Sequence, residues 1–378
     1  MVTTPTSVPT RVPFVELRPP DSSLERQLLE DIAAVIRSAT FVNGPEVEEF
    51  EIAFAEYCGA PHCVGVASGL DALRLGLLAS GLEPGDEVVV PAATFVATVE
   101  AVSQAGGVPV IADVSDRDYC LDPEAAGEAV SERTRALIPV HLYGQVADLE
   151  SLHAVAGPHG LLVIEDACQA HGSERAGRRT GSSSSAAAFS FYPTKNLGAF
   201  GDAGALVTAS ADVADGVRAL REHGQCRKYE HEREGYTARL DTIQALVLLR
   251  KLAYLERANA ERRRTAAFYR DVLEGVGDLR LPPVAPESDP VWHLFVVQTR
   301  DPASLSGHLR EQGIQTGRHY PQPIHLTPAY AHLGYPQGAF PVAERLAARC
   351  LSLPIFPGIR EHQLEHVVRE VRAYFDGR

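Results

Sequence analysis

The feature that most constrains the fold is an alternation of short apolar segments with amphipathic ones. The apolar segments are rich in β-branched residues and are predicted as the strands Cys63–Val66, Glu87–Val90, Val108–Ile111, Ala136–Val140 and Leu161–Glu165. Helical periodicity lies between them, at Gly69–Ala79, Phe95–Ala105 and Leu149–Ala156. Strands without polar alternation are buried on both faces. The pattern therefore predicts an α/β fold with a mostly parallel central sheet and helices on both faces.

The pattern changes on either side of this region. Helices are predicted before it, at Ser23–Ala39 and Glu46–Tyr57. After it, residues 241–274 are predicted as one long charged helix, and a Pro-rich segment follows. A strand at Trp292–Gln298 and helices at Pro302–Glu311, Pro341–Cys350 and His362–Phe375 complete the chain. We therefore expect an N-terminal arm (residues 1–20), a large domain (21–250) and a smaller α+β domain (251–378).

Composition narrows the function class. The net charge of −14 argues against nonspecific nucleic-acid binding, although a local cluster of donors can still bind a small anion. No apolar run approaches the ~18 residues typical of a membrane span. The Thr- and Pro-rich start, Met1–Val12, is predicted to be a loose arm rather than a signal peptide. The six cysteines show no metal-like spacing, which favours free thiols in a reducing cytoplasm.

Two strand ends carry polar residues, and ligands of parallel α/β sheets bind beyond such ends. After the first strand, Ser68 and Gly69 turn the chain into a helix whose free N–H groups favour a phosphate. A buried strand also delivers Glu165 and Asp166 to its carboxyl end. A carboxylate there can pair with the protonated ring nitrogen of a cofactor. Each motif has a plainer alternative, because Ser68 and Asp166 are both ordinary helix N-cap residues.

A third segment, Phe189–Leu206, carries a lysine after a short apolar strand and before a run of glycines. The chain has only the lysines Lys195, Lys228 and Lys251, so lysine-dependent chemistry has few candidates. A desolvated amine is a better nucleophile near neutral pH, which favours Lys195. Ser190, five residues earlier, is placed to bind a phosphate.

Together the segments S-G-L-D-A-L, E-D-A-C-Q-A-H-G and F-S-F-Y-P-T-K-N-L-G-A-F-G-D-A-G resemble the DegT-type sugar-nucleotide aminotransferases, a branch of the fold-type-I enzymes that use pyridoxal 5′-phosphate (PLP). The resemblance extends from Phe41 to the L-S-L-P-I segment at Leu351. It implies that Lys195 forms the Schiff base with PLP and that Asp166 pairs with the pyridine nitrogen. The other cofactor contacts that it implies are Gly69, Leu70 and Ser190 at the phosphate, Phe95 on the ring face and Gln169 at the phenolic oxygen.

The resemblance also implies substrate contacts. The segment His319–Tyr330 is similar to the family's sugar-nucleotide contact segment, and the region around Arg227 is similar to its nucleotide-diphosphate contact. The substrate-binding residues implied are Tyr192, Lys228, Tyr229, Arg239, His319, Tyr320 and His325. Two plainer interpretations stay open: a structural role for His325 and a solvated face for the basic run at Arg227. Lys251, on the predicted long helix, is expected on the surface.

One position departs from the family. Where the family has Asn-x-Arg-x-Asp-x-x-Gln-Ala, this chain has T-A-R-L-D-T-I-Q-A, so Thr237 replaces the Asn that reaches the PLP phosphate across the dimer interface. Arg239, Asp241 and Gln244 match. The phosphate contact from Thr237 is therefore an open question.

The function that the resemblance implies is transfer of an amino group, from L-glutamate, to a dTDP-linked 3-keto or 4-keto 6-deoxyhexose by a homodimer with its active sites at the subunit interface. With Asp202 at this position, the chain resembles the C3-aminating subgroup, since the C4-aminating subgroup has Glu there more often. Two alternatives are weighed. The first is a PLP-dependent sugar dehydratase, which has His in place of the lysine; the presence of Lys195 argues against it. The second is a noncatalytic regulator, which would not need the complete set of lysine, aspartate and phosphate-binding residues that this chain has.

Overall fold

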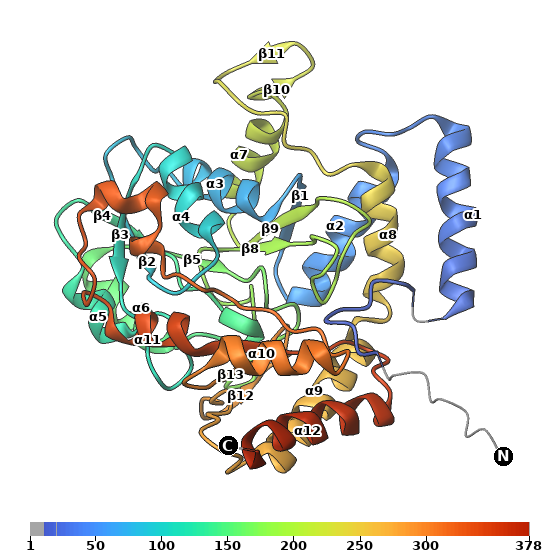
Figure 1. Ribbon diagram of the computed structural model, residues 1–378. Helices are drawn as coiled ribbons and strands as arrows, with labels where there is room; N and C mark the ends of the chain where they lie inside the picture. The colour runs from blue at the N-terminus through green and yellow to red at the C-terminus, as the bar shows by residue number, and fades with distance from the viewer. Residues whose placement is uncertain (1–10, 20, 378) are drawn as a thin grey trace.

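The computed structural model describes residues 11–19 and 21–377. Its larger part is built on a seven-stranded sheet in the order β1-β9-β8-β5-β4-β2-β3 (Figure 1). The strands are β1 (His62–Val66), β2 (Glu87–Pro91), β3 (Val108–Ala112), β4 (Thr134–Leu137), β5 (Leu162–Asp166), β8 (Ala186–Ser190) and β9 (Gly204–Thr208). Only β9 runs against its neighbours, β1 and β8. The prediction of a mostly parallel central sheet is confirmed.

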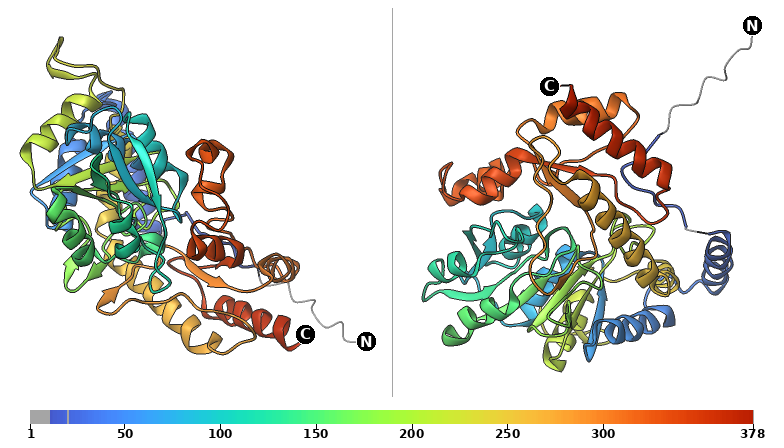
Figure 2. Two further views of the ribbon diagram at one scale, coloured as in Figure 1. Left: turned by 90° about the vertical axis from the view of Figure 1, so that its left-hand side faces the viewer. Right: turned by 90° about the horizontal axis from the view of Figure 1, so that it is seen from below.

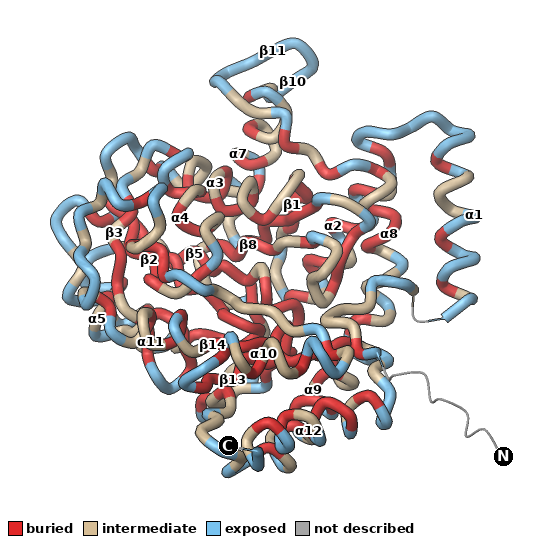
Figure 3. Tube along the Cα trace, viewed as in Figure 1, coloured by how far each residue is buried: buried red, intermediate tan, exposed pale blue. Residues whose placement is uncertain are grey.

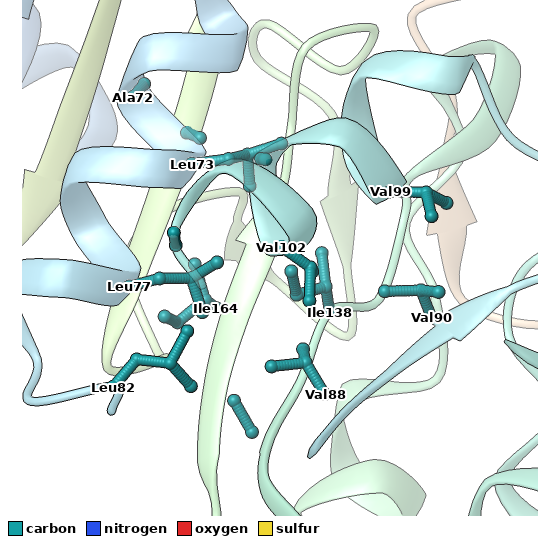
Figure 4. Packing of buried hydrophobic residues seen from close by; sticks show 14 of the residues in the cluster. Ala72, Leu73, Leu77, Leu82, Val88, Val90, Val99, Val102, Ile138 and Ile164 are labelled. Atoms are coloured by element: carbon teal, nitrogen blue, oxygen red, sulfur yellow. The ribbon is translucent and has the colours of Figure 1, made fainter. Parts of the chain in front are cut away.

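Helices cover both faces of this sheet, as predicted. On one face α3 (Gly69–Ala79), α4 (Val96–Gln104) and α7 (Ala211–Arg221) close a cluster of aliphatic side chains over the strands (Figure 4). On the other, α2 (Pro45–Cys58) and α8 (Thr242–Leu252) pack on β8 and β9, and α5 (Pro123–Glu128) and α6 (Leu149–Ala156) pack near β4 and β5. Ala188 and Ala187 belong to opposite clusters, because successive side chains of a strand point to opposite faces.

A smaller part packs beside the sheet, below it in Figure 1 and to its lower right in the left view of Figure 2. It contains the antiparallel pair β13 (Phe295–Gln298) and β14 (Cys350–Leu353), with α9 (Leu255–Leu273), α10 (Pro302–Glu311), α11 (Pro341–Arg349) and α12 (Glu361–Asp376). Short elements complete the described chain: β6 (Glu174–Arg175), β7 (Arg178–Arg179), β10 (Gln225–Arg227), β11 (Glu230–His231), β12 (Ser288–Asp289) and the 3-10 turns η1 (Leu142–Gly144), η2 (Gly157–His159), η3 (Ile324–Leu326) and η4 (Pro328–Leu333).

Two sequence-based expectations differ from the structure here. The predicted long helix is two helices, α8 and α9, which break at Ala253 and Tyr254. The break follows from packing, because α8 buries its apolar face in the large part whereas Ala266 and Tyr269 of α9 bury theirs in the small part. The strand predicted from Trp292 begins only at Phe295, since Trp292 has a positive φ of 49° and is not extended.

The N-terminal segment is attached more firmly than expected. Residues 1–10 of the predicted loose arm lie outside the described residues. From there on, Val12 is fully buried and its amide donates to the carbonyl of Gly313 at 3.0 Å. The ring of Phe14 stacks on His319 with a centroid distance of 5.6 Å. The arm therefore packs against the small part before it reaches α1 (Ser22–Ser38), which lies against α8.

The most prominent projection is the β10–β11 hairpin (Figure 1), whose residues are largely exposed (Figure 3). Within residues 11–19 and 21–377, no helix has both the length and the apolar character needed to cross a membrane.

Candidate active site

The predicted cofactor residues Asp166, Ser190 and Lys195 lie where β5 and β8 end. Asp166 is the last residue of β5, and Ser190 is the last residue of the neighbouring β8. The loop after β8 carries Lys195, whose amide donates to the carbonyl of Tyr192 at 2.8 Å. Parallel strands present their carboxyl ends at one edge of the sheet. Side chains from motifs that lie apart in the sequence therefore form a single cluster there.

Asp166 is 6% exposed and both of its oxygens are held. The Thr98 hydroxyl donates to Oδ2 at 2.7 Å, and the Cys168 amide donates to Oδ1 at 3.2 Å. Thr98 in turn bonds to Thr94, one helical turn earlier, at 2.7 Å. Residues 167–173 form turns rather than a helix, so Asp166 is not the N-cap of a helix. A buried carboxylate fixed by two donors is suited to pair with a cation.

Lys195 is set deep among protein atoms, although it keeps some accessible surface toward a cavity. Desolvation lowers the pKa of its amine, and the nearby Cys168 and Asp166 oppose this shift. The cavity that it borders has a volume of about 610 Å³, and its lining comes mainly from residues 15–25 and 251–262 and does not include Asp166 or Ser190. A larger surface groove of about 970 Å³, between α2 and α7, includes none of the predicted site residues in its lining. An amine in this setting is a better nucleophile and base near neutral pH than an exposed lysine.

The start of α3 forms a narrow cradle against the end of β8. The Ser68 side chain caps the helix by accepting from the Asp71 amide at 3.0 Å, so the N-cap interpretation of Ser68 is correct. The next position has little space, because a Cβ on Gly69 would lie 2.7 Å from Cβ of Ser190 and 2.6 Å from Sγ of Cys168. The amides of Gly69 and Leu70, in the first helical turn, remain available for an anion.

Aromatic and amide side chains form the remaining wall. Gln169 accepts from the Tyr143 amide at 2.8 Å and donates to the Tyr320 hydroxyl at 3.1 Å. Phe95, the residue before α4, is 51% exposed, and its ring centroid is 5.6 Å from that of Tyr320. The structure therefore brings Phe95, Gln169 and Tyr320 together from three distant parts of the sequence.

His319 joins this wall from the small part. Its ring Nδ1 bonds to the Ser352 hydroxyl at 2.8 Å, and its carbonyl accepts from the Tyr143 hydroxyl. Burial lowers the pKa of His319 to about 4, and the charge of Lys195 acts in the same direction. The imidazole is therefore neutral at physiological pH. Tyr143 and Thr98 were not predicted from the sequence, since neither stands in a motif that signals its contact.

The other predicted substrate residues lie apart from this cluster in a single chain. His325 is 2% exposed, bonds to Glu344 at 3.1 Å and packs on Phe340, as its structural interpretation requires. The hairpin region carries the rest. Tyr229 is 81% exposed beside Lys228, and Thr237 lies on the surface with its hydroxyl 3.3 Å from Nε2 of His223.

Two further predicted residues, Arg239 and Tyr192, lie in different surroundings. Arg239 pairs with Glu222 at 2.7 Å at the base of the hairpin, and Tyr192 is 52% exposed in the lysine loop. Lys251, expected on the surface, is half-buried instead. Its amine donates to the carbonyl of Gly198, and desolvation lowers its pKa to about 8. The expectation failed because α8 packs beside the loop that carries Lys195.

The arrangement fits PLP, the cofactor that the resemblance implies. A desolvated lysine and a buried carboxylate lie at the same sheet edge as a helix start whose first amides are available for an anion. Such a set can hold a phosphate, a cationic ring and a carbonyl at once. Within the described residues, Lys195 is the lysine that combines these neighbours.

Comparison with known proteins agrees with this geometry. The DegT/DnrJ/EryC1/StrS aminotransferase family matches residues 22–372. The dTDP-3-amino-3,4,6-trideoxy-alpha-D-glucose transaminase of Streptomyces venezuelae is 47% identical over 364 residues, which cover 96% of each chain. The erythromycin biosynthesis sensory transduction protein EryC1 of Saccharopolyspora erythraea is 47% identical over 362 residues, covering 96% of this chain and 99% of the relative.

Solved structures give the same picture. The crystal structure of DesV from S. venezuelae superimposes with a TM-score of 0.95 at 47% identity, covering 97% of this chain and 99% of DesV. NtdA from Bacillus subtilis, with bound PMP, has a TM-score of 0.89 at 31% identity, covering 97% of this chain and 85% of NtdA. The second structure holds the amino form of the cofactor that the present cluster fits.

Replacing Lys195 by Ala removes the amine that we assign to the Schiff base. We expect the visible absorbance of the bound cofactor to disappear and turnover to fall by at least the roughly 10²–10⁴-fold typical of a lost acid–base group. Absorption spectra and initial rates check this. Lys228→Ala, in the exposed hairpin, is the matched control and should keep the absorbance. Wild-type turnover by Lys195→Ala would refute the assignment.

Asp166→Asn keeps the shape of the carboxylate and removes its charge. Losing one partner of a buried charge pair costs roughly 3–5 kcal/mol, so we expect a large fall in turnover with cofactor still partly bound. Glu165→Gln is the matched control, because Glu165 is equally buried but bonds to His141 at 2.8 Å. Its turnover per folded enzyme should be unchanged. A loss of under about threefold in Asp166→Asn contradicts the role.

Proposed function

The chain belongs to the DegT/DnrJ/EryC1/StrS aminotransferase family, and we propose that it aminates C3 of a dTDP-linked 3-keto-6-deoxyhexose with L-glutamate as the amino donor. The coarser function is established by its relatives: it is a PLP-dependent sugar-nucleotide aminotransferase of deoxysugar biosynthesis. The single observation that carries the chemistry is the desolvated amine of Lys195 at the sheet edge where Asp166 lies buried.

The choice of C3 is supported from two directions. Relatives with names that specify a 3-amino sugar include the S. venezuelae transaminase and the dTDP-3-amino-3,6-dideoxy-alpha-D-galactopyranose transaminase of Aneurinibacillus thermoaerophilus, which is 41% identical over 363 residues. Within this chain, Asp202 follows the glycines of the lysine loop, as in the C3-aminating subgroup. Both relatives act on dTDP sugars by name, which supports dTDP as the nucleotide here.

The roles of the residues follow from their positions. When bound, PLP supplies an electron sink that stabilises negative charge on the carbon losing a proton. Asp166, held by Thr98 and Cys168, keeps the ring nitrogen cationic. The amine of Lys195, with its lowered pKa, takes a proton from one carbon and returns it to another. Gly69, Leu70 and Ser190 would hold the phosphate of PLP, and Phe95 would cover its ring.

Gln169 and the small part orient the remaining groups. Gln169 is fixed by Tyr143 and Tyr320, so its amide meets the phenolic side of the ring in one orientation. His319 and Tyr320 face the sugar from the small part. Because the imidazole of His319 is neutral, it can accept a hydrogen bond from a sugar hydroxyl. It also places no second positive charge near the lysine.

The working unit in our proposal is a homodimer in the cytoplasm. Large apolar side chains stay exposed in the single chain, among them Phe41, Val42, Phe95, Tyr192 and Phe200, and a second subunit would cover them. The β10–β11 hairpin projects away from its own chain, and we propose that Lys228 and Tyr229 on it, with Thr237 and Arg239 after it, serve the partner's site. His325 keeps only an indirect role, through the segment that carries Tyr320.

Regiochemistry is tested by product analysis. With L-glutamate and a dTDP-3-keto-6-deoxyhexose, we expect a dTDP-3-amino sugar, identified by NMR. The 4-keto isomer, under the same conditions, is the matched control and should be turned over far more slowly. Turnover of the 4-keto isomer alone would contradict the C3 assignment and leave the family assignment intact.

The proposed dimer contact is tested at Thr237. A hydrogen bond to a charged group contributes about 1.5–3 kcal/mol, so Thr237→Val should weaken PLP binding by up to about two orders of magnitude if the hydroxyl contacts the phosphate directly. A bridging water would make the loss smaller. Thr237→Asn restores the family's residue and should retain PLP. Absorbance after dialysis measures retention, and equal retention by Thr237→Val and wild type would exclude the contact.

A further inference from the structure

Two buried hydroxyls in series lead to the carboxylate that is proposed to pair with the cofactor ring. The Thr98 hydroxyl lies 2.7 Å from Oδ2 of Asp166, and the Thr94 hydroxyl lies 2.7 Å from that of Thr98. Thr94 is 3% exposed and Thr98 is 1% exposed. Thr98 belongs to the first turn of α4 and Thr94 lies just before that helix, so both come from the segment that carries Phe95. We call these two residues the hydroxyl chain.

The hydrogens of the hydroxyl chain can point in only one direction. An ionised carboxylate accepts hydrogen bonds and donates none, so Thr98 gives its single hydroxyl hydrogen to Asp166. The oxygen of Thr98 must then accept from Thr94, although their distance alone would allow either hydroxyl to donate. The order is therefore Thr94 to Thr98 to Asp166, and both hydrogens are directed toward the carboxylate.

Packing alone would not require these hydroxyls. Valine has nearly the same shape as threonine and would fill the same buried space without the cost of burying a polar group. Each hydroxyl has a hydrogen bond here because Asp166 ends the chain as an acceptor. Hydrogen bonds in series polarise one another, so the donor bond from Thr94 strengthens the bond that Thr98 makes to the carboxylate.

The two oxygens of Asp166 are held unequally. The Cys168 amide donates to Oδ1 at 3.2 Å, which is a longer contact than the hydroxyl bond of 2.7 Å on Oδ2. Among residues 11–19 and 21–377 each oxygen meets one donor, whereas a carboxylate oxygen has about two lone pairs. Acceptor capacity therefore remains for a ring nitrogen, and the two bonds fix the direction in which it is presented.

We propose that the hydroxyl chain keeps Asp166 ionised and fixed in orientation, so that the proton between Asp166 and the ring nitrogen of PLP stays on the nitrogen. Hydrogen bonds to the charged form of a carboxylate favour that form. Thr98 is a positioning residue, and Thr94 acts through it. Because Phe95 is part of the same segment, the start of α4 supports both the face of the ring and its counter-charge. The inference rests on the proposed role of Asp166.

NMR of the enzyme loaded with PLP that carries nitrogen-15 in its ring tests this, because the chemical shift reports whether the ring nitrogen is protonated. A hydrogen bond to a charged group is strong enough to move a protonation equilibrium by about one to two pH units. We expect Thr98→Val to lower the titration midpoint of the ring nitrogen by at least about one unit relative to wild type. Thr98→Ser keeps a hydroxyl and should stay within about half a unit.

The order within the hydroxyl chain is tested by Thr94→Val. This change leaves the contact with Asp166 in place, so the midpoint should fall by less than in Thr98→Val. The double variant should match Thr98→Val alone, because Thr94 acts only through Thr98. Additive shifts, or an unmoved midpoint in Thr98→Val, overturn the inference. If Thr98→Val does not fold, Thr94→Val decides, and an unmoved midpoint in that variant overturns the inference.

Thr208→Val is the matched control. Thr208 is 1% exposed, and its hydroxyl donates at 2.7 Å to the carbonyl of Ser185, which precedes β8 at the end remote from the site. Its loss should lower stability without moving the midpoint. The other titratable groups whose charges act together with Asp166 are unchanged in every variant, namely Cys168, Lys195 and Tyr320.

The two proposals fail separately. Wild-type turnover by Asp166→Asn refutes the role of the carboxylate itself. An unmoved midpoint in Thr98→Val, together with the expected loss of turnover in Asp166→Asn, refutes only the hydroxyl chain.

Discussion

The structure depends on a constraint that is energetically unfavourable in isolation: an amine and a carboxylate are both withdrawn from water at one edge of a sheet. Burial disfavours the charged form of each group unless an opposite charge or hydrogen bonds compensate. For Asp166 the compensation comes from Thr98 and the Cys168 amide. For Lys195 it is incomplete, and its pKa is lowered. Because the charged form of Lys195 is not fully compensated, its amine is neutral more often, and a neutral amine can act as a base.

Holding these groups in place requires a rigid support, which the sheet provides. Below β8, the rings of Phe54, Phe189 and Phe191 meet edge to face with centroid distances of 5.0 and 5.1 Å. Such contacts add to the burial of apolar area. The alternation of side chains along β5 has a parallel effect, since Glu165 bonds to His141 on one face while Asp166 serves the site at the strand end. Glu165, which has a structural role, and Asp166, which faces the site, are therefore adjacent in the sequence but have different surroundings.

The sequence predicted the parts of the fold that depend on local pattern. Gly69–Ala79 and Leu149–Ala156 were predicted with the bounds that α3 and α6 have, because their periodicity and caps are local. The break between α8 and α9 was missed because it depends on tertiary packing: α8 buries its apolar face in the large part, and α9 in the small part. Lys195 and Asp166 were predicted because motifs at strand ends mark them. Thr98 and Tyr143 were not, since their contacts span large sequence separations, such as the 68 residues between Thr98 and Asp166.

The same division explains where chemistry and substrate recognition lie in this chain. The groups to which we assign proton transfer stand at a strand end and in the loop after β8, where close packing holds them in place. The groups assigned to the sugar nucleotide stand on an exposed hairpin and on the His319–Tyr320 segment of the small part. A nucleotide sugar is bulky and varied, so its contacts are best carried by segments that change without disturbing the core. Substrate range can then diverge among relatives while the lysine, the carboxylate and the phosphate cradle stay where the sheet ends.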